Sequence, residues 1–99
     1  MTDPIGSNTG KAPYRPLGYQ QIVNPTIATF LTAPPGSTFA LVAVSAASVR
    51  WRDDGSAPDP ATGMPMIAGQ EFKYSGDLTA IQFIGAGATL DVSYYYDPQ

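Results

Sequence analysis

The 99-residue chain contains no cysteine and no histidine. Without cysteine it can form no disulfide, no thiolate metal site and no cysteine nucleophile. Without histidine it lacks the usual general base and the commonest metal ligand. Charged residues make up only 13% of the chain, against about 25% in an average globular domain. So little charge suggests a surface partly covered by a partner, although abundant Thr, Ser, Gln and Asn can solvate a surface as well.

Long basic runs and long apolar runs are also missing. The net charge is −3, and no series of Lys or Arg is present to neutralise successive phosphates or to bind anionic lipids. No apolar stretch approaches the ~20 residues that span a bilayer, and Met1–Pro4 does not resemble a signal peptide. We therefore expect no nucleic-acid or membrane partner, and a protein made in a cytosol and used or assembled there.

The residues that are present predict one small domain with an arm. A hydrophobic share of 43% suffices for a single core. Three prolines and two glycines punctuate residues 1–17, which we interpret as an extended arm before a single β domain at 18–99. The arm is either a floppy terminus or a segment that becomes ordered on a neighbouring subunit. In the second case Ile5, Tyr14 and Leu17 would be its anchors.

Short apolar runs recur between turn signals along the rest of the chain. No convincing amphipathic helix separates them, which favours an all-β fold. We predict a compact antiparallel β-sandwich or partly open, jelly-roll-like barrel of seven or eight short strands. The expected strands are Tyr19–Val23, Ile27–Thr32, Phe39–Ala46, Ser48–Asp53, Met64–Ile67, Gln70–Ser75, Thr79–Ile84 and Thr89–Tyr96.

Alternation within these runs predicts the inward side chains. Phe39–Ala46 is nearly continuous in apolar residues, as in a strand covered on both faces; a buried helix is the alternative interpretation. The predicted core consists of Ile22, Ile27, Leu31, Phe39, Leu41, Val49, Trp51, Phe72, Tyr74, Ile81, Phe83, Leu90, Val92 and Tyr94.

No catalytic, cofactor or metal constellation is visible in the sequence. Asp53 and Asp54 are adjacent, so on a strand they would point to opposite faces, and they fit better as the start of a turn into Gly55. Together with Asp59 they could surround a cation, but their spacing does not match an EF-hand loop. Serines lack both a Gly-x-Ser-x-Gly elbow and a base. We therefore expect no enzyme activity.

Aromatic and arginine side chains are the candidate contact residues. Tyr95 and Tyr96 are consecutive, so one of them must face away from the core, and exposed tyrosine is typical of interfaces. Arg50 and Arg52 share one face of their predicted strand. They either contact another subunit or serve a solvated face, pairing with nearby aspartates. Trp51 is either a core residue or a ring on which a sugar could stack.

Several stretches carry a resemblance to a known group of proteins: SVRWRDDG at 48–55, TGMPM at 62–66, AGQEF at 68–72, AIQFI at 80–84 and LDVSYY at 90–95. They resemble small proteins of tailed bacteriophages that are encoded among virion structural genes. The resemblance runs from Phe39 to Tyr95 and does not include residues 1–36. It supplies no agreed functional residues.

The resemblance implies a β-rich virion component, either a head decoration or cement protein or an accessory piece at the tail. Such a protein would be assembled in the host cytoplasm into the virion and would bind capsid or other virion proteins, with a homo-oligomer expected. The alternative is a receptor- or carbohydrate-binding module of a tail or head fibre. An exposed Trp51 beside a groove would favour the binding module, and a buried Trp51 with an ordered arm would favour the structural role.

Overall fold

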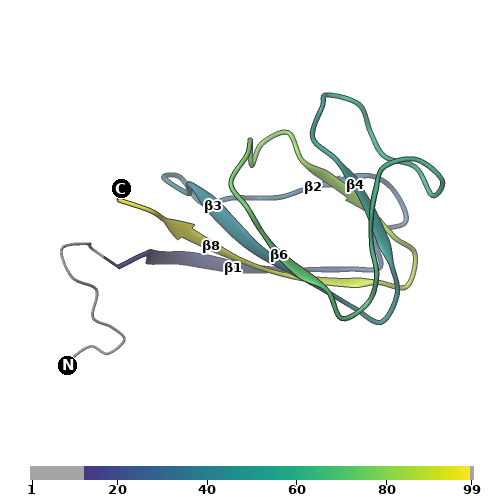
Figure 1. Ribbon diagram of the computed structural model, residues 1–99, viewed down its shortest axis with the longest axis horizontal. Helices are drawn as coiled ribbons and strands as arrows, with labels where there is room; N and C mark the ends of the chain where they lie inside the picture. Colours follow the sequence, from purple (N-terminus) through teal and green to yellow (C-terminus); the bar gives the residue numbers. More distant parts are fainter. Residues whose placement is uncertain (1–12, 99) are drawn as a thin grey trace.

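The computed structural model describes residues 13–98, which form eight β-strands and no helix (Figure 1). The strands are β1 (Arg15–Val23), β2 (Thr29–Phe30), β3 (Phe39–Ser45), β4 (Val49–Arg52), β5 (Met64–Met66), β6 (Glu71–Tyr74), β7 (Gln82–Ile84) and β8 (Thr89–Tyr96). They build two antiparallel sheets, with strand orders β1-β8-β3-β6 and β2-β7-β4-β5. The predicted antiparallel β-sandwich is confirmed.

The order of the strands is that of a jelly roll. The chain crosses from one sheet to the other at every connection except the one between β4 and β5. This gives eight strands in two sheets wound as Greek keys. The sheets do not close into a barrel, because β1 and β6 end one sheet while β2 and β5 end the other.

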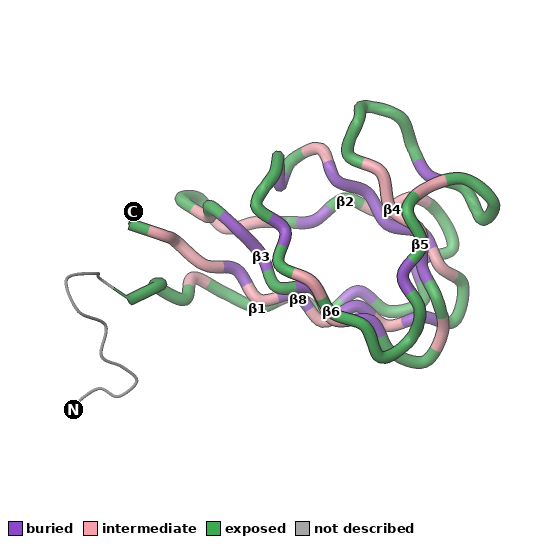
Figure 2. The backbone as a smooth tube through the Cα atoms, viewed as in Figure 1, coloured by how far each residue is buried: buried purple, intermediate pink, exposed green. Residues whose placement is uncertain are grey.

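The core lies between the two sheets. Its largest fully buried side chains come from β3, β7, β8 and the segment just before β7, and they are Val42, Ile81, Phe83, Leu90, Val92 and Tyr94. Figure 2 shows these buried stretches along the strands, with the connecting loops exposed. Each such side chain contributes about 1.5–3 kcal/mol by leaving water. Most of the predicted core is buried, while Trp51 and Phe72 are partly buried and pack against the core cluster.

Two residues of the predicted core are exposed. Ile27 lies in the connection from β1 to β2, outside any strand, and its exposed fraction is 74%. Leu41 is 40% exposed because β3 directs Ala40, Val42 and Val44 into the core. Phe39 is buried as predicted, but its alternation with these residues places it on the outer side of the sheet. Because nearly all residues of β3 are apolar, the sequence did not show which of them face the core.

The first strand begins earlier than the sequence indicated. β1 starts at Arg15, so the last three residues of the predicted arm lie within the β domain. Leu17 is partly buried and packs against the core cluster of its own chain. Pro16 is tolerated because β1 is an edge strand, and the pairing with β8 is irregular between Pro16 and Gly18. Ile5 and the rest of residues 1–12 lie outside the described residues.

Candidate functional site

The outer face of the β1-β8-β3-β6 sheet exposes several large apolar side chains. Residues opposite one another in register share a face of a sheet, and Ser93 of β8 lies opposite both Tyr19 of β1 and Leu41 of β3. Since Val92 is buried, these residues face outward. We define the outer face by the outward residues of the four strands: Tyr19, Gln21, Val23, Phe39, Leu41, Ala43, Ser45, Glu71, Lys73, Thr89, Asp91, Ser93 and Tyr95.

An aromatic cluster of Tyr14, Phe39 and Tyr95 lies at one end of this outer face. The Phe39 ring stacks on Tyr95 with centroids 5.1 Å apart and meets the edge of Tyr14 at 4.9 Å. Lys73 Nζ lies 4.4 Å from the Phe39 ring centroid and 5.0 Å from that of Tyr14. Phe39 is therefore only 3% exposed although it lies outside the sandwich core. Residues just before β1 thus cross onto the outer face.

Two of the predicted contact tyrosines meet in this region, and a third lies beside it. Tyr14 and Tyr95 contact the same ring, and Tyr96 carries the Arg15 guanidinium 5.3 Å from its ring centroid. Tyr14 remains half exposed. Phe39, Tyr19 and Leu41 were not singled out as contact residues from the sequence. Tyr19 lies three residues from Ile22 in the same strand, so the prediction that Ile22 faces the core already placed Tyr19 on the outer face.

The charges of the outer face are largely engaged within it. Asp91 accepts a 2.5 Å hydrogen bond from the Tyr19 hydroxyl and a 3.0 Å hydrogen bond from Gln21 Nε2. The Tyr19 hydroxyl, and next the Gln21 amide, hold the pKa of Asp91 below its usual value, while Asp91 raises the pKa of Tyr19. Lys73 lies over aromatic rings. Apolar and aromatic groups therefore dominate what this face offers a partner.

The two predicted contact arginines lie on the other sheet. Arg50 Nη1 donates a 2.8 Å hydrogen bond to the Gly63 carbonyl. Arg52 forms a bidentate ion pair with Asp54, with Nε and Nη2 at 3.0 and 2.6 Å from the carboxylate oxygens. This pair lowers the pKa of Asp54 and raises that of Arg52. The structure thus separates Arg50 and Arg52 from the tyrosines and gives both of them partners within the chain.

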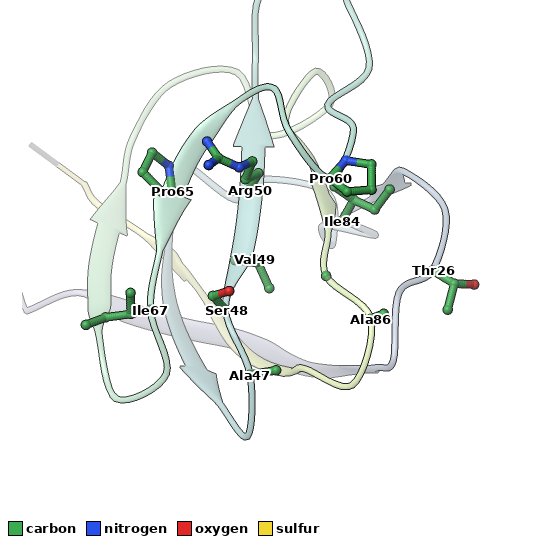
Figure 3. A pocket seen from close by; sticks show the side chains of 11 residues that line it. Thr26, Ala47, Ser48, Val49, Arg50, Pro60, Pro65, Ile67, Ile84 and Ala86 are labelled. Atoms are coloured by element: carbon green, nitrogen blue, oxygen red, sulfur yellow. The ribbon is translucent and has the colours of Figure 1, made fainter.

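Arg50 also borders a hollow of about 470 Å³ on the second sheet. Figure 3 shows Val49 and Arg50 on β4 and Ser48 just before it, with side chains of neighbouring strands and loops on either side. Ser48 and Thr26 are the hydroxyls of the lining, and the lining residues include no carboxylate. The hollow offers apolar walls and one guanidinium, but no base that could activate Ser48.

Trp51 lies at the side of the sandwich where β5 and β6 are the edges. Its ring stacks on Phe72 at 5.5 Å with an interplanar angle of 15° and meets Tyr74 edge-on at 6.0 Å. The Tyr74 hydroxyl donates a 2.7 Å hydrogen bond to Asp53. Burial, and next this carboxylate, raise the pKa of Tyr74 to about 12. Trp51 is thus half-buried and forms part of an ordered aromatic stack.

A hollow of about 390 Å³ opens beside Trp51. Its lining combines the indole ring with Met64, the Arg52–Asp54 ion pair and Asp53. A second shallow hollow lies between Trp51 and Phe72. Trp51 is therefore neither fully exposed, as the binding module would favour, nor fully buried, as the structural role would favour.

The acidic loop after β4 does not converge on a cation site. Asp53 accepts from Tyr74 and Asp54 from Arg52, while Asp59 accepts a 2.8 Å hydrogen bond from the Ala61 amide. Over residues 13–98, no group of three carboxylates is arranged to hold a metal ion. The same residues include no helix of the length and hydropathy needed to cross a membrane.

Two candidate contact regions thus remain, the outer face with its aromatic cluster and the hollow beside Trp51. The outer face is assembled from four strands far apart in the sequence, whereas the hollow is lined by residues of β4, β5 and the loop between them. Comparison with known proteins gives no match for this chain, whether with protein-family models, curated proteins or solved structures.

Proposed function

We propose that this protein is a structural component of a bacteriophage virion, a decoration or cement protein that binds between capsid subunits. The observation that carries the proposal is the outer face. It exposes Tyr19, Val23 and Leu41 and adds the half-exposed Tyr14 of the aromatic cluster. A binding surface of this kind, used many times over a shell, adds association free energy at every subunit joint.

The composition of the outer face supports a covered surface. An antiparallel sheet that faces water on one side normally alternates apolar-in with polar-out. Here the outward set contains Tyr19, Val23 and Leu41 in exposed positions. Contiguous exposed apolar groups mark interaction sites. Tyrosine suits such a site because a large, fairly rigid ring contributes much contact area at a small cost in side-chain entropy.

Phe39 and Lys73 add order to this surface. Phe39 is held by rings on both sides, and Lys73 lies over two of them. A partner would therefore meet a preformed aromatic platform and would not have to order it on binding. The jelly-roll fold is compatible with the proposal, since it occurs in viral capsid domains, but it also occurs in lectins. A fold hosts many functions, so this likeness has only the weight of an analogy.

The test is binding to phage heads that lack the protein. Leu41→Glu introduces a charge into the centre of the outer face, and we expect it to reduce occupancy of the heads at least tenfold. Ile67→Glu is the control, because Ile67 is also an exposed aliphatic residue but lies outside the outer face. Circular dichroism establishes that both variants fold. Equal occupancy by Leu41→Glu and Ile67→Glu would reject the outer face as the capsid contact.

A saccharide-binding module is the second candidate, and the hollow beside Trp51 favours it. Sugar rings stack their C–H faces on indole, while carboxylates and guanidinium groups bond their hydroxyls; Trp51, Asp53 and the Arg52–Asp54 pair offer both. Trp51 is the single tryptophan of the chain, so the fluorescence comes from the ring that lines this hollow. Titration with host-surface polysaccharides should shift the emission and saturate. An unchanged spectrum across such a panel would reject this candidate.

A further inference from the structure

The free side of β1 is the least protected edge of the sandwich. β1 is nine residues long and pairs with β8 on one side, and no described strand pairs with its other side. From Pro16 to Val23 it carries no charged residue. The other three edges are two to four residues long, and β5 contains Pro65 while β6 contains Glu71 and Lys73. Short length, proline and charge protect an edge from pairing, and only β1 lacks most of this protection.

The hydrogen bonds of β8 show which backbone groups of β1 are free. Tyr95 O accepts from Thr38 N at 2.8 Å on the β3 side, and Ala88 O accepts from Asn24 N at 2.7 Å on the β1 side. Alternate residues of a strand direct their N–H and C=O groups to opposite sides. The odd-numbered residues of β8 therefore bond toward β3, and the even-numbered residues bond toward β1.

The register transfers this alternation to β1. Gly18, Gln20 and Ile22 lie opposite the even-numbered residues of β8, so their backbone groups bond to β8. The N–H and C=O groups of Tyr19, Gln21 and Val23 consequently point away from the sheet. They form a regular row of donors and acceptors with which another extended backbone can pair.

Exposed apolar side chains gather on the same side of the sandwich. The exposed fractions are 63% for Tyr19 and 65% for Val23, and Ile27 and Phe30 on the way to β2 are also exposed. These four make up half of the large apolar side chains that are exposed among residues 13–98. An unpaired backbone edge and a concentration of exposed apolar groups therefore coincide at β1 and β2.

We propose that β1 pairs with β1 of a second copy of this chain, antiparallel and across a two-fold axis at Gln21. The two four-stranded sheets then join into one continuous sheet. Gln21 lies opposite Gln21 of the second copy, and Tyr19 lies opposite Val23 of the second copy. Every residue in these pairs directs its backbone groups to the joint, so each pair exchanges both of its N–H···O bonds.

This register satisfies the side chains as well as the backbone. A two-fold axis perpendicular to the sheet keeps the outer faces of both copies on the same side, so Tyr19 meets Val23 as an aromatic–β-branched pair. The paired segment stays within the regular part of β1 and avoids the irregularity between Pro16 and Gly18. It contains no charge, so the net charge of −3 on each chain places no like charges across the joint. The pairing is independent of the virion assignment.

Single-cysteine variants test the register, because the chain has no cysteine of its own. In a hydrogen-bonded antiparallel pair the Cα atoms are about 5.5 Å apart, which a disulfide can bridge. Gln21→Cys should therefore give a covalent dimer on mild oxidation. Tyr19→Cys and Val23→Cys alone should not, because their symmetry mates are about 14 Å apart along the strands, but a mixture of the two should cross-link.

Two results with the cysteine variants would overturn the β1–β1 pairing. Equal cross-linking of Gln21→Cys, Tyr19→Cys and Val23→Cys would indicate random collision or another register. Absence of cross-linking in folded Gln21→Cys and in the mixture would reject the pairing itself. Circular dichroism of each variant establishes that it is folded.

Sedimentation equilibrium of the purified chain measures the same contact without cysteines. We expect a dimer, and Val23→Lys should raise its dissociation constant at least tenfold because a lysine on the edge opposes pairing. Ile67→Lys is the control, since Ile67 is 61% exposed but lies outside β1, and it should leave the dissociation constant unchanged. A wild-type chain that stays monomeric at millimolar concentration, or equal effects of both lysines, would contradict the proposal. Neither result bears on whether the outer face binds phage heads.

Discussion

The two long sides of the sandwich differ in how their edges are covered. On the β5–β6 side, Trp51, Phe72 and Tyr74 stack across the gap between the sheets, and Tyr74 is tied to Asp53. On the β1–β2 side, Tyr19 and Val23 are exposed beside a backbone edge that no described strand covers. The same fold therefore has one side closed by its own aromatic side chains and one side with an unpaired backbone edge among the described strands.

On the closed side aromatic residues contact one another within the chain, and on the open side they are exposed to solvent. Aromatic groups occur on both sides, and their type does not reveal on which side they lie. Trp51 makes its ring contacts within the chain, whereas the Tyr19 ring has its hydroxyl fixed by Asp91 and most of its surface in water. Substitutions on the two sides should therefore affect different measurements.

The largest effect is expected from Trp51→Ala. Removing the indole leaves a gap between Phe72 and the core, and we expect a loss of about 3 kcal/mol in the free energy of unfolding. Urea denaturation followed by circular dichroism measures it. Tyr19→Ala is the control on the open side and should leave the free energy of unfolding nearly unchanged. Similar losses for both variants would remove the distinction between the two sides.

A smaller effect is expected at alkaline pH on the closed side. The pKa of Tyr74 is raised to about 12 by burial and by Asp53, so folding favours the neutral phenol. This stabilisation is complete below pH 10 and is lost as the pH rises through about 12, by roughly 1–2 kcal/mol. Tyr74→Phe should flatten the stability curve between about pH 10 and 12. Burial also raises the pKa of Tyr94, so the variant keeps some dependence of stability on alkaline pH. Parallel stability curves for the wild type and Tyr74→Phe would contradict the prediction.

The smallest effect is expected at acidic pH on the open side. Tyr19 and Gln21 lower the pKa of Asp91, so Asp91 stabilises the fold above the unfolded pKa of about 4. That contribution is lost as the pH falls through the folded pKa. Asp91→Asn should remove a small part of the acid-induced loss of stability in urea titrations below about pH 4. The pKa values of Asp54, Asp59 and Asp77 are also lowered, so these carboxylates account for the rest of the acid-induced loss of stability. An acid profile of Asp91→Asn identical to that of the wild type would contradict the role of Asp91.

Most of the strands could be predicted from the sequence because turn residues separate them. The predicted Thr89–Tyr96 coincides with β8, where apolar and polar residues alternate, and the inward Leu90, Val92 and Tyr94 are buried. The inward and outward residues of β3 could not be predicted in the same way, because its apolar residues hardly alternate with polar ones. Its phase depends on contacts with β6 and β8, which lie far away in the sequence.

The outer face could be predicted only in part. Tyr95 was identified from its position beside Tyr96, but the burial of Phe39 depends on Tyr14 crossing the sheet, which local pattern does not encode. The sequence also indicated an arm through Leu17, since Pro16 weakens a strand. It could not show that pairing with β8 begins at Arg15, because an edge strand needs bonds on one side only.

The position of β8 has a consequence for how the protein is made. β8 lies between β1 and β3, and it supplies the one described strand with which β1 pairs. A growing chain on the ribosome cannot complete this sheet until residues 89–96 have emerged, however long ago β1 was synthesised. Because such distant pairings are slow to form, β1 stays without its described strand partner until β8 has been made, whereas β3 can already pair with β6.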